Sequence, residues 1–331
     1  MTLQNSRSLS SLPALLLGLA AAVPVLAQPA AQPGYPSRPI RLILPQTAGT
    51  GVDVVLRKAF EAMQPRMGQA FVVDYHPGSN QMAGAELCAR AVPDGHTICA
   101  LSVDPLALNP HIFAKLPYDP FKDFRPVTSL YYIVSGWFGK ATLAANSIGE
   151  LRALAVAKPG TLNWATLGPR TNTDLTRIWV GELWRTSFTG IPYKGGPPIM
   201  NAIVAGEVDV TTQGVYVGIE LVKTGKAKLF AISASKRLRI FPNVPTLKEL
   251  GMGEAPVPWW GMVVPAGTPD AIVTRLNSEI VRVFRDPKFA EFLEALATEA
   301  NVGTPQAFAA MIKSEHQAFG QMVKRFNIKP E

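Results

Sequence analysis

The sequence lacks the short motifs that identify common hydrolases, metalloproteases and nucleotide-binding enzymes. It contains no G-x-S-x-G, H-E-x-x-H or Walker A pattern. Gly49 and Gly51 lie between an expected strand and an expected helix, but a dinucleotide fingerprint needs a third glycine where Val54 stands. Four histidines and two cysteines occur without the spacing of a metal site. We therefore expect neither an enzyme nor a bound cofactor or metal.

Long apolar runs are absent after residue 27, but one lies before it. Residues 12–26 are mostly Leu, Ala and Val, follow a single charged residue, Arg7, and lead to Ala27. This pattern predicts a signal peptide, residues 1–27, cleaved after Ala27, and hence export to the periplasm. An uncleaved anchor is the alternative reading. No cysteine lies directly after the cleavage region, which argues against a lipoprotein.

Charge of one sign is not concentrated in any segment. Of the 32 Lys and Arg residues, 31 lie after Ala27, as do all 24 acidic residues, so the mature net charge is 31 − 24 = +7. The basic residues form no block or aromatic-interleaved stripe of the kind that binds nucleic acid. We expect a soluble monomer with no nucleic-acid partner, whose surface mildly attracts anions.

The two cysteines, Cys88 and Cys99, leave two alternatives open. An even number of cysteines in an exported protein permits a disulfide. The Pro93–Gly95 turn between an expected helix and an expected strand would return the chain on itself. Two buried, unpaired thiols fit the sequence equally well, because free cysteine behaves as a small hydrophobic residue.

Short apolar runs alternate with amphipathic segments along most of the mature chain. Such alternation predicts an α/β fold, with parallel sheets covered by helices. Asn172 or Thr173 is the expected N-cap of a helix over 174–185, and Thr304 that of the last helix. Strands are expected at 40–44, 71–75, 97–101, 162–165, 208–212 and 229–233, and helices from 52 and at 82–91, 174–185, 270–284, 287–297 and 305–326.

Two strand-to-helix loops carry the residues best suited to bind an anion. A helix N-terminus presents unpaired N–H groups and a partial positive charge, and small residues let a ligand approach the backbone. Arg170 adds a side chain able to clamp a carboxylate. An ordinary connecting turn is the alternative reading of each loop. The candidate ligand-binding residues are Thr47, Ala48, Gly49, Thr50, Gly51 and Asp53 in the first loop, and Gly168, Arg170, Thr171, Asn172 and Thr173 in the second.

A series of segments resembles the Bug receptors, the TctC-type periplasmic components of tripartite tricarboxylate transporters. Their order and spacing extend over nearly the whole mature chain, although no single segment is decisive. The segments are YPSRPI (35–40), PDGHT (93–97), NPHIF (109–113), LPYDPFKDF (116–124), KPGTLN (158–163), PYKG (192–195), PNVPT (242–246), WG (260–261) and PAGTP (265–269).

The resemblance implies a two-domain periplasmic binding protein of type II-like fold. Each domain would be a mainly parallel sheet flanked by helices, with the ligand in the interdomain cleft. Domain 1 would comprise residues 36–131 and 235–331, and domain 2 residues 132–234. The implied function is capture of a small organic carboxylate for membrane transporter subunits. A sensing subunit of a two-component signalling system would need the same cleft.

The sequence departs from the family pattern within the implied site. Asp104 stands where Thr or Ser is common, and Gln213 lies near a position that usually carries an Asp-Asn pair. Asp104 is either a cleft residue that accepts hydrogen bonds from a ligand or a turn residue before Pro105. Tyr193 is a candidate for the cleft wall, ahead of Tyr216 and the Trp259–Trp260 pair.

Overall fold

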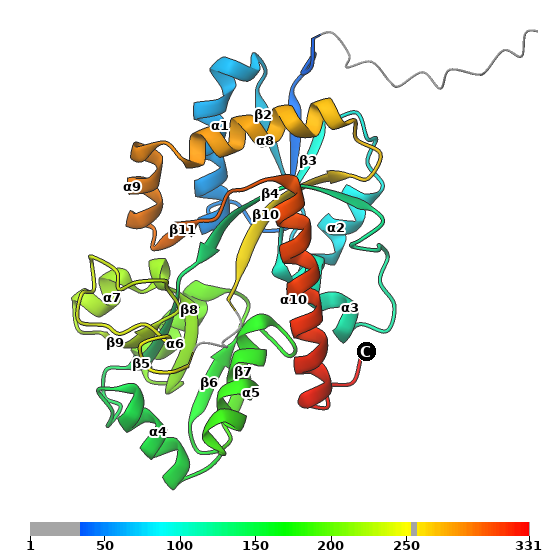
Figure 1. The fold of residues 1–331 in the computed structure, drawn as a ribbon. Helices are drawn as coiled ribbons and strands as arrows, with labels where there is room; N and C mark the ends of the chain where they lie inside the picture. The colour runs from blue at the N-terminus through cyan, green and yellow to red at the C-terminus, as the bar shows by residue number, and fades with distance from the viewer. Residues whose placement is uncertain (1–33, 253–256, 331) are drawn as a thin grey trace, which may run out of the picture.

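The computed structural model of the protein describes residues 34–252 and 257–330. The predicted signal peptide, residues 1–27, lies outside the described residues. The chain forms two β-sheets, each covered by helices (Figure 1), which confirms the predicted α/β class. Among the described helices, none is long and apolar enough to cross a bilayer.

The first sheet has six strands and uses both ends of the chain. Parallel pairs join β1 to β2 and to β3, whereas β10 runs antiparallel between β3 and β4. Pairing is therefore mixed rather than mainly parallel, because β10 re-enters this sheet from the second one. In spatial order the strands are β11 (Thr298–Ala300), β4 (Phe124–Ile133), β10 (Trp259–Pro265), β3 (Thr97–Ser102), β1 (Ile40–Leu44) and β2 (Phe71–Tyr75).

Helices bury both faces of this sheet. One apolar cluster lies between the sheet and α1, α8 and α9, and another between the sheet and α2, η2 and α10. The helices are α1 (Gly51–Met67), α2 (Met82–Ala89), α3 (Asn109–Ile112), α8 (Asp270–Phe284), α9 (Pro287–Ala295) and α10 (Pro305–Arg325), with the short turns η1 (Ser79–Gln81) and η2 (Asp104–Leu108).

The second sheet has five strands from the middle of the chain. Trp137 anchors one face, with ring centroids 5.4 Å from Trp164 and 5.9 Å from Trp184. In spatial order the strands are β7 (Thr189–Pro192), β6 (Asn163–Thr166), β8 (Val210–Gly214), β5 (Ser135–Lys140) and β9 (Ala227–Ile232). The helical segments are α4 (Ile148–Ala157), α5 (Asn172–Trp184), α6 (Gly196–Ala205), η3 (Val215–Val217) and α7 (Ile219–Lys223).

The two sheets are linked by extended chain and by α10. β4 passes into β5 through the buried Val134. The last helix, α10, runs from the first sheet towards the second (Figure 1), and Arg325 Nε donates to Glu182 Oε1 of α5 at 2.6 Å. The domain boundaries expected from the resemblance, 36–131 with 235–331 and 132–234, stay a prediction.

Cys88 of α2 and Cys99 of β3 form a disulfide, with Cα atoms 6.2 Å apart. Both residues are fully buried. Of the two alternatives left by the sequence, the structure therefore has the bridge. It fastens α2 to the strand that neighbours β1, beside the first candidate loop.

Candidate functional site

The loop between β1 and α1 folds back on itself. Gly49 has φ +81°, a conformation that glycine adopts without steric penalty. Its N–H donates to Asp53 Oδ2 at 2.8 Å, and Thr50 Oγ1 donates to the Thr47 carbonyl at 3.0 Å. Thr47, Ala48 and Gly49 are exposed. The loop thus keeps a fixed shape while its tip stays accessible.

Asp53 holds this loop in place. Its side chain is buried, and its carboxylate also accepts from the Tyr75 hydroxyl at 2.8 Å and from Arg57 Nε at 3.0 Å. The carboxylate thus accepts three hydrogen bonds, all of them from groups of the protein. Asp53 thus positions the loop through these bonds, and its expected contact with a ligand stays a prediction.

The loop between β6 and α5 has the same internal arrangement. The Arg170 N–H donates to Asp174 Oδ2 at 3.0 Å, and Thr171 Oγ1 donates to the Gly168 carbonyl at 2.7 Å. Arg177 Nε donates to Asp174 Oδ1 at 2.9 Å, as Arg57 does to the aspartate of the first loop. Arg170 takes the place of glycine, with φ +62°.

Both helices begin with backbone amides that no group within the helix accepts from. The N-caps are Thr50 and Thr171, with φ/ψ of −70°/159° and −71°/163°, and neither threonine side chain caps its own helix. The expected cap of α5, Asn172 or Thr173, was therefore wrong by one or two residues. The first intrahelical bonds are donated by Val54 and Leu175, so the three preceding amides of each helix have no intrahelical acceptor. These amides are suited to bind an anion.

Some predicted residues of the second loop are already engaged. Thr173 Oγ1 accepts from the Leu167 N–H at 2.9 Å and lies 3.0 Å from Thr171 Oγ1. The Gly168 N–H donates to Thr166 Oγ1 at 3.3 Å. These groups shape the loop, and the amides at the start of α5 are among its remaining donors.

Each sheet and the helices that cover it form one unit of the molecule. The N-terminus of α1 faces the unit of the second sheet, and the N-terminus of α5 faces the unit of the first. A Cβ placed on Gly51 would lie 3.1 Å from Cζ of Tyr216, a residue of η3 beyond the second sheet. In turn, Leu175 of α5 is fully buried in the same apolar cluster as Val103 and Leu106 of the first unit. Both candidate loops therefore lie at the junction of the two units.

Three further predicted residues contribute unpartnered polar atoms. Asp104 Oδ1, Asn172 Nδ2 and Gln213 Nε2 are buried without a hydrogen-bond partner among the described residues. Burial raises the pKa of the Asp104 carboxyl to about 6. Buried polar atoms are nearly always paired, so these unpaired ones are candidates to bind a ligand.

The aromatic candidates are distributed differently from expectation. Tyr193 packs on the apolar cluster of α6, and burial together with Glu207 raises the pKa of its hydroxyl. Tyr193 thus packs partly against α6, and its place in the cleft wall stays a prediction. Trp259 and Trp260 are buried in the core. Tyr216, the less favoured candidate, is the residue that contacts the first loop, and only the fold identifies it.

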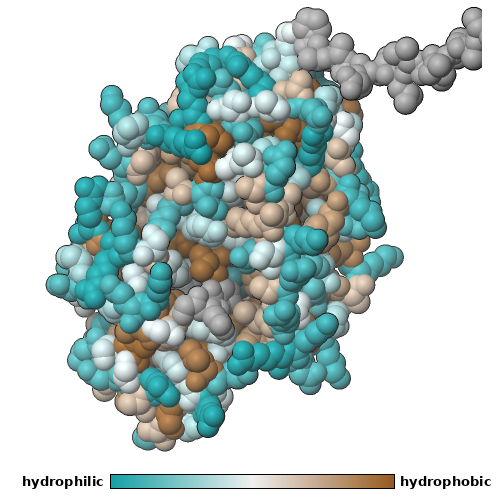
Figure 2. Space-filling view, in the orientation of Figure 1, coloured by the Kyte–Doolittle hydropathy of each residue, from teal (hydrophilic) through white to brown (hydrophobic). Residues whose placement is uncertain are grey.

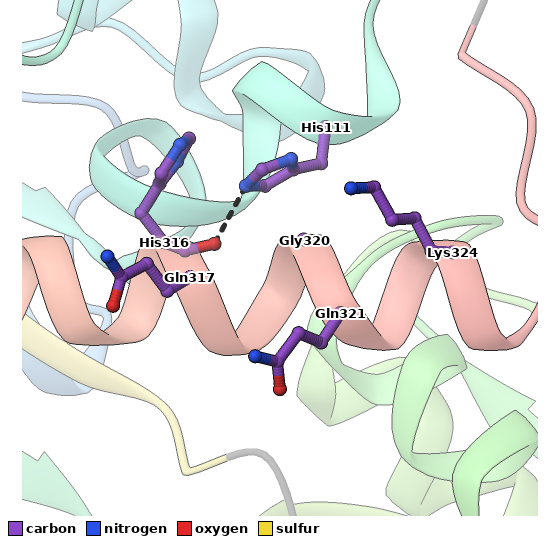
Figure 3. A pocket seen from close by; sticks show the side chains of 6 residues that line it. All are labelled: His111, His316, Gln317, Gly320, Gln321 and Lys324. Atoms are coloured by element: carbon purple, nitrogen blue, oxygen red, sulfur yellow. Dashed lines mark hydrogen bonds between the residues drawn. The ribbon is translucent and has the colours of Figure 1, made fainter.

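A separate groove of about 530 Å³ lies between α3 and α10 (Figure 3). His111 Nε2 donates to the His316 carbonyl at 2.8 Å across it, and burial lowers the pKa of His111. This groove shares no residue with the candidate loops. Neither this groove nor any other part of the described chain holds a group of three metal-ligating side chains.

Comparison with known proteins identifies the family. A UPF0065 protein of Bordetella bronchiseptica is 33% identical over 313 residues, which cover 94% of this chain and 93% of the relative. The solved structure of the periplasmic binding protein BugD is 27% identical with a TM-score of 0.79, covering 90% of this chain and all of that one. The malate-bound structure of MatC from Rhodopseudomonas palustris is 26% identical with a TM-score of 0.76, covering 87% and 100%.

A family profile matches most of the chain as well. Residues 55–328 fit the TctC profile, described as the tripartite tricarboxylate transporter family receptor. The two-sheet fold agrees with that match, as the TM-scores show, and the match to these relatives covers most of each chain. The chain belongs to the receptor family of tripartite tricarboxylate transporters.

Proposed function

We propose that this protein binds one small organic carboxylate at the junction of its two units and presents it to a membrane transporter. The observation that carries the proposal is the repeated loop geometry at the starts of α1 and α5. Each helix directs free first-turn amides and a positive dipole end towards the junction. Malate bound to MatC, a related receptor, supports an organic acid as the ligand class.

Ligand binding would be coupled to a hinge motion that closes the two units. Domain 1 (36–131 and 235–331) and domain 2 (132–234) each contribute one loop, so the ligand joins them and favours the closed form. Closure would form or strengthen two contacts between the units, that of Tyr216 with Gly51 and that of Arg325 with Glu182. The closed receptor then docks on the transporter.

No covalent chemistry is required for this role. The carboxylates of the two loops are occupied by amides and arginines, which leaves them as scaffolding rather than as bases. We therefore propose a binding protein and not an enzyme, working as a monomer without a cofactor. Its location would be the periplasm, after removal of residues 1–27.

The test begins with the ligand that accompanies the protein from its own host. Mass spectrometry of native protein purified without dialysis should find an organic acid, unchanged on incubation. A converted product would instead indicate an enzyme. Thermal-shift measurements over mono-, di- and tricarboxylates, amino acids and aromatic acids should then show stabilisation by at least one acid. Deletion of the partner transporter genes should abolish uptake; retained uptake with altered gene expression would indicate sensing.

A further inference from the structure

Asp104 follows the end of β3, and its carboxyl group has no described partner. Its backbone N–H donates to Ser102 Oγ at 3.2 Å, and that hydroxyl accepts from Gln81 Nε2 at 2.7 Å. Oδ1 is buried and unpaired, although the residue as a whole remains partly accessible. One carboxyl oxygen is thus desolvated and unpaired, while part of the residue stays in contact with solvent.

The charges around Asp104 do not neutralise it. No ion pair reaches it within the described chain, and desolvation is the cause of its raised pKa. The titratable group that faces it is Tyr118, whose own pKa is raised, chiefly by burial, and whose hydroxyl accepts from Asn109 Nδ2 at 3.0 Å. Above about pH 6 the carboxylate is therefore negative and lacks a cation.

Asp104 lies at the edge that both helix N-termini face. β1 and β3 are parallel neighbours, so their carboxyl ends meet at one edge of the sheet, where β1 runs into the first loop. Leu175, in the first turn of α5, shares a buried cluster with Val103 and Leu106, on either side of Asp104. The carboxyl thus belongs to the junction between the two loops.

The unpaired groups at this junction are of two kinds. Asn172 Nδ2 and Gln213 Nε2 are buried donors, which match the oxygens of a carboxylate, as do the helix amides. Asp104, when ionised, only accepts. A second carboxylate placed against it would meet a like charge in a poorly solvated site, which is unfavourable.

We propose that Asp104 determines specificity by accepting a hydrogen bond from the ligand, which is an organic acid carrying an amino or hydroxyl group. This inference rests on the proposed function and adds the ligand's second chemical group. A carboxylate of the ligand binds at the helix N-termini, and its donor pairs with Asp104. An acid without such a donor leaves the Asp104 carboxylate desolvated and unpaired.

Two matched triads of acids test the inference by calorimetry at pH 7.5. Succinate, malate and aspartate share one skeleton, as do propionate, lactate and alanine, and within each triad only the hydrogen, hydroxyl or amino substituent differs. The proteins are wild type, Asp104→Ala, Asp104→Asn and a control, Glu61→Gln, which removes the same charge from the exposed face of α1.

The wild type and the control should bind a donor-bearing acid about tenfold or more tightly than its unsubstituted analogue. Tenfold corresponds to the lower end of the free energy of one hydrogen bond to a charged group. Asp104→Ala should reduce that preference to about threefold or less. Asp104→Asn keeps an acceptor without charge, so it should retain more of a hydroxyl preference than of an amino preference. A merely structural role would weaken all acids alike and leave the ratios unchanged.

Failure of this inference is distinguishable from failure of the proposed function. Tightest binding of succinate or propionate by the wild type, or an unchanged ratio in Asp104→Ala, would overturn the role of Asp104 and leave the receptor intact. A native ligand with a carboxylate but no amino or hydroxyl group would do the same. Absence of binding by all six acids, together with a native ligand that lacks a carboxylate, would overturn both.

Discussion

The loops before α1 and α5 share one backbone plan but differ in the side chains they present. Both have a threonine that bonds back three residues and an aspartate that holds an amide four residues before it. In the first loop, glycine occupies two positions, 49 and 51, where the second has Arg170 and Asn172. At these two positions the first loop therefore offers backbone alone, whereas the second adds polar side chains.

This difference assigns separate tasks to the two units. Gly51 leaves room for Tyr216 to approach from the other unit, so in the proposed mechanism the first loop would serve closure as well as binding. The second loop carries the guanidinium of Arg170 and the unpaired carboxamide nitrogen of Asn172, which the proposed function assigns to ligand binding. The face of the molecule drawn in Figure 2 is largely hydrophilic, with scattered hydrophobic areas.

Removing the shared aspartates should break both loops and have the largest effect. Asp53→Ala deletes the acceptor for an amide, a tyrosine hydroxyl and an arginine, and Asp174→Ala deletes the acceptor for an amide and an arginine. We expect each to weaken acid binding by more than about tenfold and to lower the free energy of unfolding by about 2–4 kcal/mol. Calorimetry and urea denaturation measure these quantities. Undiminished binding by a folded Asp53→Ala protein would contradict the assigned role.

Adding one methyl group at Gly51 should impair closure through the first loop without changing the second loop. Gly51→Ala places a Cβ 3.1 Å from Tyr216 Cζ, closer than ordinary van der Waals contact, so closure is hindered. We expect affinity to fall by roughly fivefold, or about 1 kcal/mol. In a Tyr216→Ala background the same change should have little effect. Equal losses in both backgrounds would show that Tyr216 is not the obstacle.

The side chain of Arg170 should matter by a few-fold. Arg170→Ala removes a charge-assisted donor and should weaken carboxylate binding to that extent. Because Arg170 has φ +62°, alanine also adds backbone strain. Arg170→Gly removes the side chain without that strain. Its affinity for the acid should therefore equal that of Arg170→Ala, and its melting temperature should be higher. Unchanged affinity in both variants would remove Arg170 from the site.

The pH dependence of stability gives the smallest and finest test. The pKa of Asp104 rises from 3.8 to about 6 on folding, so its contribution to stability is greatest below pH 4 and is lost as pH rises through 6. Asp104→Asn cannot ionise. Its melting temperature relative to wild type should therefore increase by a few degrees between pH 4 and pH 7.5, measured without ligand. A constant difference would contradict the raised pKa.

The sequence predicts the scaffold better than the site. The strands at 40–44 and 71–75 and the helix at 270–284 begin and end as expected, because hydrophobic periodicity is a local signal. The two loops were also located from their glycines, threonines and positions before helices. The inward turn of Asp53, the packing of Tyr193 on α6 and the contact of Tyr216 with Gly51 depend on neighbours distant in sequence, so no local pattern reveals them.

A crystal structure of the protein with its native acid tests the central claim most directly. We predict that one ligand accepts hydrogen bonds of about 2.7–3.2 Å from first-turn amides of both α1 and α5. A ligand that touches only one of these helix N-termini, or that binds in the groove between α3 and α10, would contradict the account.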